Sequence, residues 1–325
     1  MKVAVLGATG AVGQTMLQVL AERLPEVEEV VPMGSPRSVG KTLEWRGREW
    51  RVTAPDPAAF RGCRVALFSA GSQLSREWAP VAAAAGAVVV DNSSAWRLDP
   101  DVPLVVPEVN GPRVADLRNG IIANPNCSTI QLVLPLEALR RAAGVEQVVV
   151  STYQSVSGAG RKGTRSYESE LAGGRDPDSP FPGEIVGNVI PRIGPLRDDG
   201  WTEEEEKMRA ETRKILGLPA LAVTATCVRV PVAVGHAVVA MTVLERPLSL
   251  GQARAAIAGM PGVVLWDEAA DPLPREVAGG DDVHVGRLRS DPDHPNVCHM
   301  WIVADNLRKG AATNAVQIAA LVIRG

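Results

Sequence analysis

Cys127 is the residue whose setting best fits covalent chemistry. It lies in the stretch Asn-Pro-Asn-Cys-Ser-Thr, between an apolar pair, Ile121 and Ile122, and an apolar run that begins at Ile130. This pattern predicts a strand, a turn and a helix whose first turn carries the thiol. An ordinary thiol has a pKa of about 8.5, and the open amides of a helix N-terminus favour the thiolate. Cys127 is therefore either a nucleophile or a small residue that fills a strand-to-helix turn.

The other three cysteines lie far apart, in or beside apolar runs, where a free cysteine is usually a small buried residue. The sequence has no C-x-x-C pair. That argues against a zinc site and against a disulfide framework, and it is typical of a reducing cytoplasm. We therefore expect no metal and a cytoplasmic location.

A nucleophile needs a second group that handles protons. His236 is one of four histidines and follows Gly235 at the start of a predicted strand, so a tight turn would aim its ring. His294 falls in a predicted exposed turn, and His284 and His299 lie on strand-like runs, where a core or surface histidine is usual. Arg229 lies in the apolar stretch Thr-Cys-Val-Arg-Val-Pro-Val. It is either a bidentate clamp for a carboxylate or a residue on the exposed face of a half-buried strand.

Glu204 and Lys207 are two further charged residues, and they share one face of a predicted helix. Thr202 and Glu205 form a capping-box pattern at the start of this helix. Pairs of opposite charge three residues apart are usually solvated and contribute a few tenths of a kcal/mol, roughly 0.2–0.5. The spacing alone thus indicates a surface ion pair.

Glycines occur at every third position of residues 7–13, after an apolar strand and before a helix. Such a turn lets the backbone approach a pyrophosphate, although it is also found as a plain tight turn. The next strand is followed by a segment without Asp or Glu that contains Ser35, Arg37 and Ser38. An acid there would hold the ribose of NAD, whereas Arg37 and the serines suit a 2′-phosphate. The pattern favours NADP over NAD.

The chain has 325 residues, which suggests about two domains. In the first half, apolar strands alternate with helices, which predicts an α/β fold with a doubly wound, mostly parallel, Rossmann-like sheet. Residues 42–52 alternate apolar and polar on either side of Arg46, Gly47 and Arg48, which predicts a β-hairpin. After residue 127 longer strands predict a mixed or antiparallel sheet with helices on one face, and we expect an α+β domain with a mixed sheet. Residues 173–200 predict a long loop, and the last residues predict a helix.

Composition excludes two classes of partner. The net charge is -3 and no basic run is present, so nucleic acid is not an expected partner. No stretch of about 20 apolar residues occurs, so no membrane span is expected.

Taken together, these motifs resemble the aspartate-β-semialdehyde dehydrogenase family. The resemblance covers nearly the whole chain, and the order and number of the motifs make it specific. The matching segments are GATGAVG, SPRSVGK, FSAG, DNSSAWRLDPDVPLVVPEVN, NPNCST, STYQSVSGAG, TCVRVPV with the following GH, and WIVADNLRKGAATNAVQIA.

The resemblance implies roles for these positions. Cys127 would form an acyl-enzyme thioester, Gln154 would orient the acyl group, and His236 would be the acid/base. The substrate contacts it implies are Arg229 for the α-carboxylate, Glu204 for the ammonium, and Arg97, Lys207 and Asn126 for the phosphate. The NADP contacts it implies are Thr9, Gly10, Ala11, Val12, Gly13, Ser35, Arg37, Ser38, Ser157, Gly158, Asn306 and Gln317.

The implied reaction is the reductive dephosphorylation of 4-phospho-L-aspartate to L-aspartate 4-semialdehyde, in the biosynthesis of lysine, threonine, methionine and diaminopimelate. The implied domains are an NADP-binding domain of residues 1–126 and 307–325, and a catalytic and dimerisation domain of residues 127–306 that forms a homodimer. Two alternatives are an N-acetyl-γ-glutamyl-phosphate reductase and a non-catalytic nucleotide-binding paralogue.

Pro135 lies within the helix predicted after Cys127, and it predicts a kink or a break in this helix.

Overall fold

The computed structural model describes residues 1–267 and 269–325. The chain forms two compact units. Unit 1 comprises Met1–Asn126 and Ala311–Gly325, and unit 2 comprises Cys127–Gly310. No helix in the described part of the chain is both long enough and apolar enough to cross a membrane.

Unit 1 is built on a five-stranded sheet in the order β2-β1-β5-β6-β7, in which every pair is parallel. Its strands are short and rich in Val, Leu and Ile, as expected for strands covered on both faces. The predicted doubly wound parallel sheet is confirmed. The strands are β1 (Lys2–Leu6), β2 (Glu29–Met33), β5 (Cys63–Phe68), β6 (Val88–Asp91) and β7 (Ile121–Ala123).

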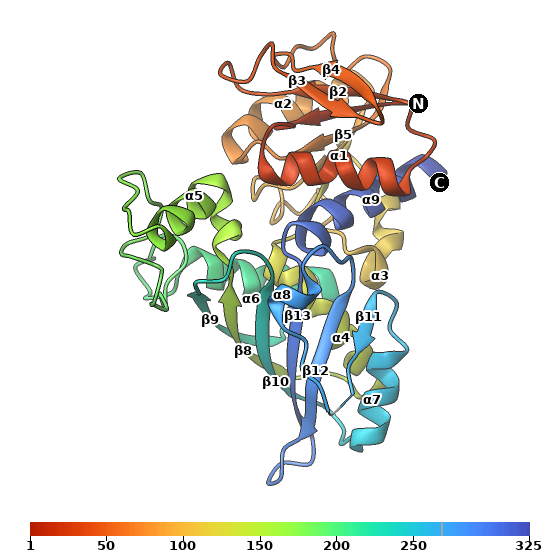
Figure 1. Cartoon of the computed structure of the whole chain (residues 1–325). Coiled ribbons are helices and arrows are strands. Elements are labelled where there is room, and N and C mark those ends of the chain that lie inside the picture. Colours follow the sequence, from red (N-terminus) through yellow and green to blue (C-terminus); the bar gives the residue numbers. More distant parts are fainter. Residues whose placement is uncertain (268) are drawn as a thin grey trace. The chain divides into compact units, whose positions relative to one another are not determined.

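Helices cover this sheet and complete its core. The last helix of the chain packs against the first one and against strands β5 and β6, which returns the C-terminal segment to unit 1 (Figure 1). Apolar side chains of both helices join those of the strands in one buried cluster. The helices are α1 (Ala11–Arg23), α2 (Ser72–Ala84), α3 (Pro107–Asn110), the 3₁₀ turn η1 (Gly111–Asp116) and α9 (Asn314–Arg324).

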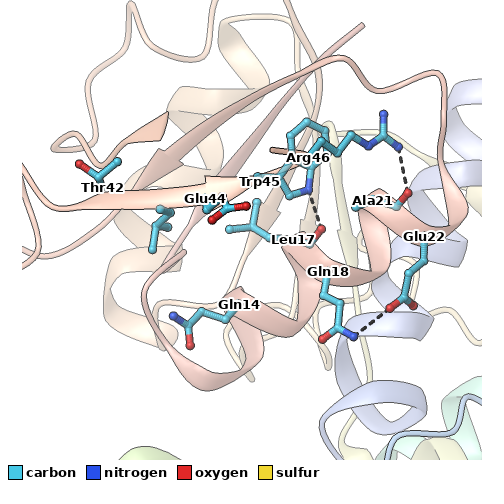
Figure 2. Close-up of a pocket in the computed structure, with 10 residues that line it drawn as sticks. Gln14, Leu17, Gln18, Ala21, Glu22, Thr42, Glu44, Trp45 and Arg46 are labelled. Atoms are coloured by element: carbon cyan, nitrogen blue, oxygen red, sulfur yellow. Dashed lines mark hydrogen bonds between the residues drawn. The ribbon is translucent and has the colours of Figure 1, made fainter. Parts of the chain in front are cut away.

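The predicted hairpin is present, with β3 (Thr42–Trp45) and β4 (Arg48–Arg51) paired antiparallel. Arg46 and Gly47 both have positive φ, as a two-residue hairpin turn requires. The hairpin and α1 line a groove of about 560 Å³, in which the Trp45 indole donates to the carbonyl of Leu17 (Figure 2). The Arg46 guanidinium donates to carbonyls at the C-terminal end of α1 and just beyond it: Leu20, Ala21, Leu24, Pro25 and Val27.

We expect Arg46→Ala to lower the free energy of unfolding by about 1–2 kcal/mol, because several carbonyls at a helix C-terminus lose a cationic donor. Chemical denaturation would measure the loss. Arg48→Ala is the matched control, since Arg48 is an exposed arginine of the same hairpin. Equal losses for the two variants would show that the guanidinium does not stabilise the helix end.

Unit 2 contains a six-stranded mixed sheet in the order β11-β12-β13-β10-β8-β9. The outer pairs β8–β9 and β11–β12 are parallel, and the pairs between them are antiparallel. The predicted mixed sheet is therefore confirmed. The strands are β8 (Gln147–Gln154), β9 (Ala222–Arg229), β10 (His236–Val243), β11 (Val263–Leu265), β12 (Val283–Ser290) and β13 (Val297–Ala304).

The helices of unit 2 include one that carries the thiol. They are α4 (Cys127–Ala143), the 3₁₀ turn η2 (Val156–Ala159), α5 (Gly160–Leu171), α6 (Glu203–Leu216), α7 (Leu250–Ala258) and α8 (Pro274–Val277); the π-helical turn η3 (Arg308–Thr313) leads into α9. A kink or a break was predicted at Pro135, and the break is wrong, because α4 continues to Ala143. All of residues 128–139 of α4 are buried, and packing on every side of the helix holds it through the missing hydrogen bond. No helix or strand lies between α5 and α6, as predicted for the long loop.

Candidate active site

Cys127 is the first residue of α4 and differs from the other cysteines in exposure. It is partly exposed, whereas Cys63, Cys227 and Cys298 are buried. Burial raises the pKa of the Cys227 thiol far above its usual range, and the nearby Glu204 carboxylate raises this pKa further. Burial also raises the pKa of Cys63 and of Cys298. Those three thiols stay protonated and unreactive at neutral pH, which leaves Cys127 as the candidate nucleophile.

The chain that follows β13 passes closely over the thiol-bearing residue. A Cβ placed on Gly310 would lie 2.9 Å from the Cβ of Cys127. The Gly310 amide donates to the carbonyl of Asp305, which holds the turn in this position. Position 310 thus leaves no room for a side chain beside Cys127.

His236 opens strand β10 and its side chain is fully buried. Its Nδ1 lies 3.0 Å from the backbone nitrogen of Ser155, which donates to it, and 3.0 Å from the Ser155 hydroxyl. Its Nε2 has no hydrogen-bond partner in the part of the chain that the structure describes. Burial lowers the pKa of His236 well below its usual value, and the positive charge of Arg229 lowers this pKa further. The ring is therefore neutral at pH 7.

Arg229 ends strand β9 and is buried, so the alternative of an exposed strand face is wrong. Alternate residues of β9 are buried beneath α6, and period-two alternation places Arg229 on that covered face. Its Nη1 donates to the carbonyl of Ser155 at 2.6 Å. The ring of Phe181 lies 6.0 Å from the guanidinium carbon. A guanidinium that is desolvated to this degree is suited to pair with an anion.

The backbone at Gly158 lies beside the side chains of both Arg229 and His236. A Cβ at this position would lie 2.8 Å from Nη1 of Arg229 and 3.0 Å from Nε2 of His236. The backbone of η2 therefore lies directly against both groups. Cys127 belongs to the same neighbourhood, because its charge acts on the pKa of Arg229.

Gln154 and Glu204 are joined within the core of unit 2. The Gln154 amide donates to Oε1 of Glu204 at 3.1 Å, and Thr152 donates to the Gln154 carbonyl oxygen. Lys207 donates to Oε2 of Glu204 at 3.3 Å. The Glu204 side chain is only 9% exposed. The prediction that Glu204 and Lys207 form a solvated surface pair is therefore wrong for Glu204. The capping box that starts this helix is present as predicted.

Gln131 is a residue that the sequence did not single out. It is fully buried one turn after Cys127, and its amide donates to the carbonyls of His236 and Ile302 at 3.2 and 3.4 Å. These bonds fix the thiol-bearing helix to strands β10 and β13. A single glutamine within the apolar run of α4 is the signal that could have indicated this role.

Two predicted cofactor contacts of unit 2, Ser157 and Asn306, are buried and bonded to each other. The Asn306 carbonyl oxygen accepts from the backbone of Gly235 at 2.9 Å and from the Ser155 hydroxyl at 3.0 Å. The Asn306 amide donates to the Ser157 hydroxyl at 3.0 Å. Both side chains thus belong to the network that surrounds His236.

In unit 1 the glycine turn fits a dinucleotide. Gly7 has a φ of +88°, and a Cβ at Gly13 would lie 2.1 Å from the carbonyl oxygen of Gly7, so only glycine lets α1 start this close to β1. Gly10 caps α1 without a side-chain hydrogen bond, and the first turn of α1, which holds Ala11 and Val12, has no acid. The amides of this helix end therefore suit the phosphates of a cofactor.

The segment after β2 meets the glycine turn through one side-chain contact. The hydroxyls of Thr9 and Ser38 lie 3.0 Å apart, and Ser38 is buried. Ser35 and Arg37 are exposed. The donor set is made of hydroxyls and one guanidinium, which suits a phosphate better than a ribose hydroxyl.

Three other predicted site residues lie in unit 1. Arg97 is buried and donates to the carbonyl of Asn92 at 3.0 Å. Asn126 is also buried, at the end of the segment that follows β7. Gln317, on α9, donates to Glu108 at 2.8 Å. Among the described residues, no group of three or more His, Cys, Asp or Glu side chains is arranged to hold a metal ion.

Two family models match the chain. The NAD binding domain of semialdehyde dehydrogenases matches residues 2–117, and their dimerisation domain matches residues 136–309. An aspartate-semialdehyde dehydrogenase of Aquifex aeolicus (strain VF5) is 48% identical over 99% of this chain and 98% of its own length. The chain belongs to the aspartate-semialdehyde dehydrogenase family.

Two solved structures of this family extend the comparison. The aspartate semialdehyde dehydrogenase II of Vibrio cholerae, complexed with ASA, has a TM-score of 0.94 and 46% identity, and the match covers 99% of this chain and 98% of that one. The enzyme from Candida albicans, solved with NADP, has a TM-score of 0.77 and 25% identity, with 99% and 98% covered. The predictions of an oxidoreductase of this family and of a nucleotide-binding Rossmann-like domain are confirmed.

Proposed function

We propose that this member of the family reduces 4-phospho-L-aspartate to L-aspartate 4-semialdehyde, reversibly, through a thioester on Cys127. The observation that carries the proposal is the pair of buried opposite charges, Arg229 and Glu204, in the unit that holds the thiol. A guanidinium suits an α-carboxylate and a carboxylate suits an ammonium, so the pair matches an amino acid. The complex of the Vibrio cholerae relative with ASA supports this choice.

The steps follow from the residues of unit 2. The Cys127 thiolate attacks the acyl carbon of the phosphorylated substrate, the C–S bond forms, and phosphate leaves with the electron pair of the C–O bond. When bound, NADPH supplies the hydride that reduces the thioester carbonyl. The resulting thiohemiacetal oxyanion collapses to the aldehyde and returns the thiolate to Cys127. Gln154 orients the acyl group, and Nε2 of His236 acts on the carbonyl oxygen as the acid/base partner.

Further ligands are proposed for each unit by itself. In unit 1 we propose Arg97 and Asn126 as phosphate ligands, with Gln317 and the glycine turn as cofactor contacts. In unit 2 we propose Lys207 for phosphate, and Ser157, Gly158 and Asn306 on the cofactor side. We also propose a homodimer, which the dimerisation-domain match supports, a cytoplasmic enzyme, and a place in the synthesis of lysine, threonine, methionine and diaminopimelate.

The alternative substrate is an N-acetyl-γ-glutamyl phosphate. Its acylated nitrogen carries no charge, so it offers Glu204 no cation to bind, whereas the free ammonium of an amino acid does. A non-catalytic paralogue has no use for the thiol, the buried guanidinium and the neutral histidine that unit 2 retains. The structure therefore favours the free amino acid substrate.

NADP is the proposed cofactor because Arg37 and the hydroxyls of Ser35 and Ser38 follow β2. We expect Arg37→Ala to raise the KM for NADP by about 10- to 100-fold, because a charge-assisted contact to the 2′-phosphate is lost, and to leave the KM for NAD unchanged. Steady-state kinetics with both cofactors would measure this. Arg61→Ala is the matched control for an exposed arginine of the same unit. A parallel rise for NAD would contradict the assignment.

The steady-state assay for the function follows NADPH formation from L-aspartate 4-semialdehyde, NADP and phosphate, with N-acetyl-glutamate semialdehyde as the competing substrate. We expect turnover with the first substrate that requires phosphate and at least about 100-fold lower kcat/KM with the second. Preference for the acetylated substrate would overturn the proposal.

A further inference from the structure

Glu205 makes a hydrogen bond that its capping box does not require. Its Oε2 accepts from the backbone nitrogen of Thr202 at 2.8 Å, which is the capping-box bond. Its Oε1 accepts from the backbone nitrogen of Cys227, on strand β9, at 3.1 Å. All three residues are buried, so water does not compete effectively for these bonds. A single carboxylate therefore ties the first turn of α6 to β9.

The bond to Cys227 is made at the outer edge of the mixed sheet. β9 is an outer strand, so every second backbone N–H of this strand points away from β8. One of these outward groups is the N–H of Arg229, which donates to the carbonyl of Ile190 at 2.8 Å. The N–H of Cys227 lies two residues earlier and belongs to the same edge. Glu205 thus fixes the edge of β9 beside the residue that carries the proposed carboxylate ligand.

Glu204, the proposed ligand of the ammonium, is the chain neighbour of Glu205. Its Oε1 accepts from the amide of Gln154 on β8, and the register of β8 and β9 pairs Gln154 with Arg229. Burial lowers the pKa of Arg229, and the Glu204 carboxylate acts on this pKa in the opposite direction, so the two charges are close. Two successive acids of α6 therefore reach two adjacent strands: Glu204 reaches β8 through Gln154, and Glu205 reaches β9 directly.

We propose that Glu205 is a positioning residue that fixes the distance between Arg229 and Glu204, and that this distance selects substrates with a carboxylate and an ammonium on the same carbon. The inference rests on the proposed function for the roles of Arg229 and Glu204. A substrate with one charge binds its own partner whatever the distance between the two ligands. An α-amino acid must engage both ligands at once, so it alone benefits from a fixed spacing.

The test compares three aldehydes in the phosphate-dependent oxidation by NADP. L-Aspartate 4-semialdehyde carries both charges, 3-aminopropanal lacks the carboxylate, and 4-oxobutanoate lacks the ammonium. In Glu205→Ala we expect kcat/KM to fall by about 10- to 50-fold for aspartate semialdehyde, chiefly through KM, and by less than about 3-fold for each truncated aldehyde. An equal loss for all three aldehydes, or no loss for aspartate semialdehyde, would overturn the proposal.

Gln252 supplies the matched control. It has the same capping-box position in α7, where its Oε1 accepts from the backbone nitrogen of Ser249 at 3.0 Å. Gln252→Ala therefore removes the same kind of cap from a helix to which we assign no substrate contact. We expect kcat/KM for all three aldehydes to stay within about 2-fold of the parent. The same selective loss in Gln252→Ala would show that capping, and not the bond to β9, causes the effect.

Hydrogen exchange of the Cys227 amide reads the bond to β9 without substrate. We expect this amide to be protected in the parent and to exchange at least about 10-fold faster in Glu205→Ala. An unprotected Cys227 amide in the parent would overturn the proposal.

Glu205→Gln is the second variant, for the case that Glu205→Ala does not fold. It keeps the size of the side chain but only one acceptor oxygen, so it can retain either the cap or the bond to β9. The selective loss of activity should appear if the Cys227 amide exchanges faster, and it should be absent if this amide stays protected. The opposite pairing would overturn the proposal. If the parent does not turn over aspartate semialdehyde, the proposed function fails, while hydrogen exchange still decides whether Glu205 holds β9.

Discussion

Cys127→Ser lowers kcat for aspartate semialdehyde oxidation by at least about 1,000-fold in our account. A serine hydroxyl is almost the same size as the thiol, but it is not ionised near neutral pH, where a small fraction of a cysteine is already a strong nucleophile. Because Cys127 is only partly buried at the start of α4, the substitution should leave the fold intact. Steady-state rates together with thermal unfolding would measure both effects.

The matched control is Cys298→Ala, which removes a buried thiol of the same unit from strand β13. We expect its kcat to stay within about 3-fold of the parent, since its burial-raised pKa keeps it protonated. Full activity in Cys127→Ser would remove the thioester from the mechanism, even if the substrate were correctly assigned.

Arg229→Lys should lower kcat/KM for aspartate semialdehyde by about 100-fold or more, chiefly through KM. A lysine keeps the charge, but it offers one ammonium where the guanidinium can bind both carboxylate oxygens. The substitution also removes the bond to the Ser155 carbonyl, which Nη1 makes at 2.6 Å. Steady-state kinetics would show the change.

Substrate truncation supplies the control for Arg229. The amine 3-aminopropanal has the aldehyde and the ammonium of the proposed substrate but no α-carboxylate. With 3-aminopropanal, the kcat/KM values of the parent and of Arg229→Lys should therefore differ by less than about 5-fold, because this substrate has no carboxylate for Arg229 to bind. A 100-fold difference that persists with 3-aminopropanal would mean that Arg229 serves the fold or the catalytic groups instead of the carboxylate.

The sequence predicts the framework of this protein well because the framework depends on local patterns. Short apolar runs that alternate with helices predicted the parallel sheet of unit 1, and apolar and polar alternation on either side of residues 46–48 predicted the hairpin. Period-two alternation shows that Arg229 and Val230 face opposite ways, but it does not show which face α6 covers. For this reason the sequence left open whether Arg229 was exposed.

The remaining features depend on contacts between residues far apart in the chain. Gln131 meets the carbonyl of a residue 105 positions away, and Ser155 meets a ring 81 positions away. No local spacing encodes such pairs. Pro135 shows the opposite error, since a strong local signal was overridden by the burial of α4. The burial of Glu204 was missed for the same reason, because packing of α6 against β9 and α4 decides it.

The central claim is that the reaction passes through a thioester on Cys127, and one measurement tests it directly. The chain is mixed with excess aspartate semialdehyde and NADP in the absence of phosphate, NADPH is followed, and the quenched protein is analysed by mass spectrometry. Without phosphate, the account predicts a burst of about one NADPH per active site and an acyl group on the peptide that contains Cys127. After phosphate is added, it predicts that the acyl group leaves Cys127 and that NADPH forms at a steady rate. Steady turnover without phosphate and without an adduct on Cys127 would contradict it.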